Sequence, residues 1–108
     1  MKLYLDDERA APVGWVRVDN VEDCISILKS CDVSDLSLDH DLGREDQTGY
    51  DVLAWMEEEI RYGSYNPPQN MAIHTANPPA RERMTQALDS ISLYMRCYRL
   101  DWECKAGV

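Results

Sequence analysis

Short hydrophobic runs alternate along the chain with longer segments in which apolar residues recur every three or four positions. The short runs predict four β-strands, at residues 2–5, 16–18, 35–39 and 71–75. The longer segments predict three amphipathic helices, at residues 21–31, 49–62 and about 77–94. Residues 96–103 fit neither pattern. The predicted order is therefore strand, strand, helix, strand, helix, strand, helix.

Strands that are separated by helices of this length pair in parallel through right-handed crossovers. The pattern therefore predicts an α/β fold with an open parallel sheet flanked by helices. A chain of 108 residues has room for one hydrophobic core, so we expect a single domain over residues 1–108. In such sheets, ligands bind beyond the carboxyl ends of the strands.

Charge and cysteine content narrow the classes of function. Twenty Asp and Glu against eleven Lys and Arg give a net charge of −9, which argues against nonspecific nucleic-acid binding. This balance still permits plain solubility, capture of a divalent cation, or docking on a basic protein surface. The four cysteines form no Cys-x-x-Cys pair, and no stretch approaches the roughly 18 apolar residues of a membrane helix. We expect core thiols, no membrane contact and a cytoplasmic location.

Acidic residues gather where the predicted strands end. Asp6 and Asp7 follow the first strand, Asp39 ends the third, and Asp41 lies two residues later. Carboxylates that converge at one sheet edge repel each other by about a few kcal/mol per close pair, and a bound divalent ion removes the conflict. The alternative is that these residues form turns or cap helices, where Asp is favoured in any protein.

Both histidines also lie at this edge. His40 stands between two acids, and His74 lies at the end of the last predicted strand, directly before Thr75. An imidazole can donate or accept a proton near neutral pH, although a lone histidine is more often structural. Thr75, Asn77 and the start of the third helix offer donors for a phosphoryl oxygen.

Five sequence motifs carry a resemblance to a known family. They are LDDER at 5–9, the loop with Pro12, Gly14 and Trp15, SLDHDLG at 37–43, TGYDV at 48–52 and HTANP at 74–78. Together they resemble the cyclic-phosphate-processing receiver-like family, which is related to response-regulator receiver domains. The likeness runs from Leu5 to Met84. It implies a receiver-like (flavodoxin-like) sheet whose first crossover helix is reduced to a loop, and action on cyclic phosphate ends in RNA repair or nucleotide processing.

The resemblance also implies roles for individual residues. Asp6 and Asp7 become metal-binding acids, Asp39 takes the place of the phospho-acceptor of receivers, and Thr75 becomes the phosphate-contacting hydroxyl. Ordinary receivers have a lysine after a fifth strand, whereas the late lysine here is Lys105. This difference argues against phosphorelay signalling.

We therefore predict a metal-dependent phosphoesterase that opens a cyclic phosphate on a nucleotide or RNA end. The expected metal ligands for Mg²⁺ or Mn²⁺ are Asp6, Asp7, Asp39 and Asp41. The expected catalytic residues are Asp39, His40 and His74, and the expected phosphate-binding residues are Thr75, Asn77 and Arg9. Whether Asp39 attacks phosphorus or only binds metal stays open. Two alternatives remain: a noncatalytic receiver-like switch with a protein partner, and a small acidic inhibitor that mimics nucleic acid.

Overall fold

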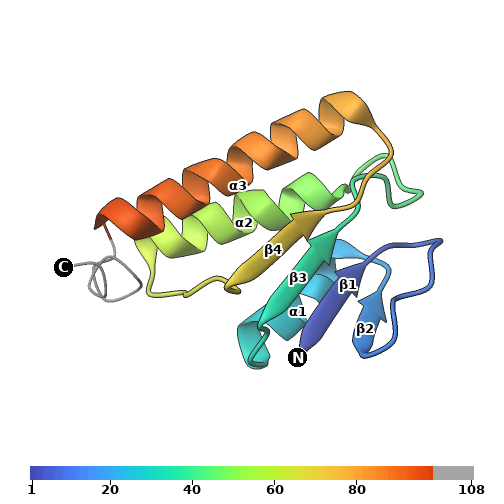
Figure 1. Ribbon diagram of the computed structural model, residues 1–108, viewed down its shortest axis with the longest axis horizontal. Helices are drawn as coiled ribbons and strands as arrows, with labels where there is room; N and C mark the ends of the chain where they lie inside the picture. Colours follow the sequence, from blue (N-terminus) through green and yellow to red (C-terminus); the bar gives the residue numbers. More distant parts are fainter. Residues whose placement is uncertain (99–108) are drawn as a thin grey trace.

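The computed structural model describes residues 1–98, and these form one sheet and three helices (Figure 1). The strands are β1 (Lys2–Leu5), β2 (Trp15–Val18), β3 (Asp35–Leu38) and β4 (Asn70–Ile73). The helices are α1 (Val21–Ser30), α2 (Gly49–Tyr62) and α3 (Pro78–Tyr98). The predicted order of elements is confirmed.

The four strands are all parallel, in the order β2-β1-β3-β4. Residues 6–14 connect β1 to β2 without a helix, which confirms that the first crossover helix is reduced to a loop. The other crossovers each contain a helix. The fold is the receiver-like α/β open sheet that the sequence predicts.

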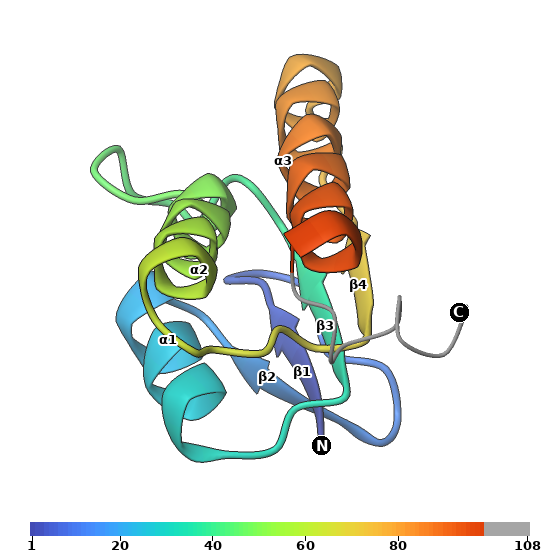
Figure 2. The ribbon, with the colours of Figure 1, turned by 90° about the vertical axis from the view of Figure 1, so that its left-hand side faces the viewer.

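All three helices lie on one side of the sheet (Figure 2). On that side the side chains of Leu3, Leu5, Leu36 and Leu38 are fully buried and form the centre of the hydrophobic core. We call the opposite side the open face. By strand register it carries Lys2, Tyr4, Trp15, Arg17, Asp35, Ser37, Asn70 and Ala72.

The ends of several elements differ from the sequence expectation. β3 ends at Leu38 and β4 at Ile73, so Asp39 and His74 lie just beyond their strands. Helix α3 is longer than expected and includes residues 96–98, while residues 99–103 lie outside the described part of the chain. Strand ends are difficult to place from sequence because hydrogen bonding to the neighbouring strand decides them.

The expectation of core thiols is wrong for two cysteines. Cys24 is buried on α1, and burial raises the pKa of its thiol to about 12. Cys31 and Cys97 are exposed, in the case of Cys31 because α1 ends one residue before it. Cys104 lies outside the described residues. Among the helices of residues 1–98, none has the length and apolar character needed to cross a membrane.

Candidate functional site

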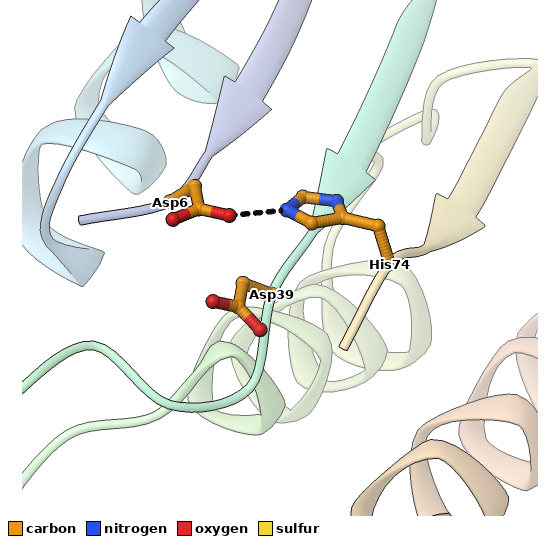
Figure 3. Close-up of side chains that lie close together, drawn as sticks. All are labelled: Asp6, Asp39 and His74. Atoms are coloured by element: carbon orange, nitrogen blue, oxygen red, sulfur yellow. Dashed lines mark hydrogen bonds and ion pairs between the residues drawn. The ribbon is translucent and has the colours of Figure 1, made fainter. Parts of the chain in front are cut away.

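Three side chains converge at the carboxyl ends of adjacent strands (Figure 3). Asp6 follows β1, Asp39 follows β3 and His74 follows β4, and the register aligns the last residues of these three strands. One ligand atom from each of the three residues lies within 4.8 Å of the other two. The strand order therefore brings together residues that are up to 68 positions apart in the chain.

Asp6 is the most buried member of this cluster, with a relative exposure of 1%. Its Oδ1 accepts the backbone N–H groups of Glu8 and Arg9, both at 2.8 Å, and its Oδ2 lies 3.0 Å from Nε2 of His74. Burial by itself would raise the pKa of Asp6, but these hydrogen bonds hold it below its usual range. Asp6 thus shapes the turn after β1 and also carries a negative charge into the site.

His74 is held through both ring nitrogens. Nδ1 lies 2.7 Å from Oγ of Ser37, and Nε2 faces Asp6. Burial lowers the pKa of His74, although Asp6 opposes the shift, so the ring is neutral at neutral pH. Because ionised Asp6 can only accept, Nε2–H donates to Asp6 and the Ser37 hydroxyl donates to Nδ1.

Ser37 was not predicted as a site residue, although strand alternation places it on the same face as the acids. Its side chain is small and buried, and the His74 ring reaches across it from β4 to stack on Tyr4 of β1. The two ring centroids are 4.2 Å apart and the planes differ by 4°. A hydroxyl on the central strand therefore gives the imidazole both room and a partner.

Asp39 is half-buried, and its Oδ1 accepts the backbone N–H of His40 at 2.8 Å. Burial raises the pKa of this carboxyl, and the nearby negative charge of Asp6 adds to the increase, while the hydrogen bond from His40 opposes it. Ionisation of Asp39 is therefore less favourable in the folded protein than in water. A cation beside it would relieve both the burial and the repulsion.

The position of Asp39 depends on a glycine at the start of α2. The backbone N–H of Gly49 donates to the carbonyl of His40 at 2.9 Å. A Cβ at Gly49 would overlap the carbonyl oxygen of Asp39 and press on Met84. The helix can approach the end of β3 this closely only because residue 49 has no side chain.

A cleft of about 290 Å³ opens beside Asp39. The predicted metal ligands Asp7 and Asp41 line it together with Asp39, whereas Asp6 does not. The remaining lining residues are Glu8, Arg9, Gly43, Thr75 and Ala76. Four carboxylates, one guanidinium and one hydroxyl therefore border a single hollow.

The three predicted phosphate-binding residues occupy different environments. Thr75 is buried, lines the cleft and accepts the N–H of Asn77 on Oγ1 at 3.2 Å. Asn77 caps α3, because its Oδ1 accepts the N–H of Ala80 at 3.2 Å. Arg9 donates from Nη1 to the carbonyl of His74 at 2.6 Å and is about half exposed. Thr75 and Arg9 therefore border the cleft, while the side-chain oxygen of Asn77 is engaged in capping.

His40 lies apart from the cluster of Asp6, Asp39 and His74. Its Nδ1 is 2.9 Å from Oδ1 of Asp41, which is well exposed and lines the cleft. The imidazole itself is only 12% exposed. The two histidines thus contact different acids: His74 contacts Asp6, and His40 contacts Asp41.

Comparison with known families gives a match over most of the chain. A family model described as a cyclic-phosphate processing receiver domain matches residues 1–90, which include every residue of the site. Searches of curated proteins and of solved structures found no match.

Proposed function

The chain belongs to the family of cyclic-phosphate processing receiver domains, and from this premise we propose that it is a metal-dependent phosphoesterase. Its substrate is a cyclic phosphate on a nucleotide or RNA end. The reaction adds water to phosphorus, breaks one of the two ester bonds of the ring, and leaves a phosphomonoester beside a free hydroxyl group.

The convergence of Asp6, Asp39 and His74 is the observation that carries this proposal. Two carboxylates and one imidazole with ligand atoms within 4.8 Å form a donor set for a divalent ion. The raised pKa of Asp39 supports the same interpretation, since burial and the charge of Asp6 disfavour its ionised form and a bound cation would oppose both effects. Mg²⁺ favours oxygen ligands, so the imidazole makes Mn²⁺ the better fit.

Asp39, Asp6 and His74 would hold this ion, and Asp7 and Asp41 line the cleft beside Asp39. When bound, such an ion polarises a phosphoryl oxygen and lowers the pKa of a coordinated water. Ser37 can hydrogen-bond Nδ1 of His74 in either tautomer of the ring, because a hydroxyl both donates and accepts. Thr75 and Arg9 border the cleft and would bind the remaining phosphoryl oxygens.

We assign different roles to the two histidines. His74 faces Ser37 through Nδ1 and Asp6 through Nε2, so it would act as a ligand once Nε2 gives up its proton and its hydrogen bond to Asp6, with Nδ1–H then donating to Ser37. His40 is linked through Nδ1 to Asp41 on the cleft wall and would carry the proton to the leaving oxygen.

The two alternative functions predict other arrangements. A nucleic-acid mimic needs carboxylates spread over an outer surface, such as Glu57, Glu58 and Glu59 on α2, and does not need acids that converge at strand ends. A receiver-like switch would hold a phosphoryl group on Asp39 and change its partner affinity. The convergent donors and the cleft beside Asp39 favour the enzyme.

The test is hydrolysis of a panel of cyclic nucleotides and RNA oligonucleotides with 2′,3′-cyclic phosphate ends, in Mn²⁺, in Mg²⁺ and in chelator. We expect turnover that requires the metal and is lost in Asp39→Asn. Glu58→Gln removes the same charge from an exposed position on α2 and is the matched control. A stable phosphoryl adduct on Asp39 after treatment with a small phosphodonor, without hydrolysis, would instead establish the switch.

A further inference from the structure

A row of aromatic side chains crosses the open face and ends in the site. The His74 ring stacks on Tyr4, and Tyr4 meets Trp15 edge to face, with 6.1 Å between centroids and an angle of 79°. We call Trp15, Tyr4 and His74 the aromatic row. Because His74 also contacts Asp6, one end of the row is shared with the candidate metal site.

Positive charges accompany this row. The ammonium group of Lys2 lies 5.9 Å from the centroid of a Trp15 ring. Arg17 is exposed and donates from Nη1 to the carbonyl of Asp6 at 3.2 Å, and Arg9 lies at the site end. Among the eight residues of the open face, Asp35 is the one acid. On a chain with a net charge of −9, this face has the sign that attracts phosphates.

We propose that the aromatic row is a base-stacking platform for a single-stranded RNA end whose terminal phosphate lies in the cleft. The proposal rests on the proposed function and names its substrate class. Aromatic side chains flanked by cations are the combination that binds single-stranded nucleic acid, because bases stack on the rings while cations follow the backbone. No helix covers this side of the sheet in residues 1–98 (Figure 2), which leaves the face open to such a ligand.

The row is no longer than a short oligonucleotide. The ring of Trp15 is no farther from the ring of His74 than the two centroid separations combined. Successive stacked bases lie about 3.4 Å apart, so two or three nucleotides would cover the distance. The site would therefore recognise a short end, which agrees with an acidic chain that does not bind nucleic acid along its length.

The opposite side of the protein offers a matched control. Trp55 on α2 is half-buried, meets Tyr65 edge to face at 5.1 Å, and has the ammonium of Lys29 6.0 Å from its ring. Trp15 has the same kind of surroundings, with Tyr4 and Lys2. If Trp15 has a purely structural role, replacing it should affect RNA binding no more than replacing Trp55 does. If Trp15 belongs to a platform, only its replacement should weaken RNA binding.

The experiment measures binding of an adenosine trinucleotide with a 3′-terminal phosphate by fluorescence anisotropy, in Mn²⁺. The full chain is compared with Trp15→Ala, Trp15→Leu and Trp55→Ala. We expect both Trp15 variants to bind about tenfold more weakly or worse and Trp55→Ala to bind as the parent does. Trp15→Leu keeps apolar volume, so it provides the test if Trp15→Ala does not fold. The same trinucleotide with abasic sugars should bind the parent as weakly as the intact one binds the variants.

Equal binding of the abasic and intact probes, or unchanged binding by folded Trp15→Leu, would overturn the platform. A change of oligomeric state in the Trp15 variants would overturn it too, because a second copy of the chain would then cover the face. The hydrolysis assay separates the two proposals. Binding that depends on Trp15 without any hydrolysis supports the platform and refutes the enzyme. Hydrolysis at the same rate with and without bases on the substrate supports the enzyme and refutes the platform.

Discussion

Replacing Asp39 by asparagine should make the metal-free protein more stable. Burial and the negative charge of Asp6 raise the pKa of Asp39, so its ionised form is disfavoured in the folded state. Asparagine has nearly the same size, and its side-chain oxygen can still accept the N–H of His40. The substitution therefore removes an unfavourable charge and keeps the local hydrogen bond.

The separation of the two carboxylates gives the magnitude. Oxygens of Asp6 and Asp39 lie within 4.8 Å of each other. Two unit charges about 5 Å apart repel by about 1 kcal/mol at the dielectric constant of water and by about 3 kcal/mol at an effective value of 20. Because Asp39 is only half-buried and Arg9 offsets part of the repulsion, we expect a gain of about 1 kcal/mol. In a domain of this size that corresponds to about 4 to 8 °C in Tm.

The assay is thermal unfolding at pH 7 in chelator and again with millimolar Mn²⁺. Without metal, Asp39→Asn should unfold at a higher temperature than the parent. With Mn²⁺, the parent should gain stability and the variant should not, because binding to the folded state stabilises it by mass action. The gain in chelator should fade as the pH falls through the raised folded pKa and should vanish below the ordinary value near 3.8, where Asp39 is protonated in both the folded and the unfolded state.

Asp6→Asn makes the same chemical change as Asp39→Asn, but it should destabilise the protein. Both oxygens of Asp6 accept hydrogen bonds, so an amide NH₂ would face either the two backbone donors or Nε2–H of His74. The free energy of unfolding of this variant should be about 1 to 3 kcal/mol lower than that of the parent. If Asp39→Asn is no more stable than the parent in chelator at pH 7, the view that ionised Asp39 destabilises the metal-free folded protein is wrong.

Three further predictions concern the support of the site. Ser37→Ala removes the donor to Nδ1 of His74 and should cost about 1 kcal/mol, with a shift of the Nδ1 signal in the nitrogen NMR spectrum of the ring but no change of tautomer, because Asp6 still accepts from Nε2–H. Gly49→Ala should cost about 2 kcal/mol or more in urea unfolding and weaken Mn²⁺ binding, because its Cβ collides with the carbonyl of Asp39. NMR titration should place the pKa of His74 below 6.5. The unfolded chain then binds more protons, so this contribution to stability is complete above pH 6.5 and is lost as the pH falls through the folded pKa; a pKa above 6.5 would contradict the assigned hydrogen bonds.

Local patterns were enough to predict the elements and their order. Apolar spacing gave helix α2 with its exact bounds and gave the four strands to within a few residues, because these signals depend on neighbours along the chain. The same patterns placed Asp6, Asp39 and His74 at strand ends. They also indicated a parallel sheet, whose carboxyl ends share one edge.

Only the tertiary structure decided which of these residues meet. Strand order places β1 beside β3 and β3 beside β4, and this order brings Asp6 and Asp39 together and lets His74 reach across Ser37 to both Asp6 and Tyr4. The same arrangement leaves the open face with its aromatic row. Side-chain periodicity tells which face a residue occupies, but distances between strands depend on pairing between distant segments, which no local stretch of sequence contains.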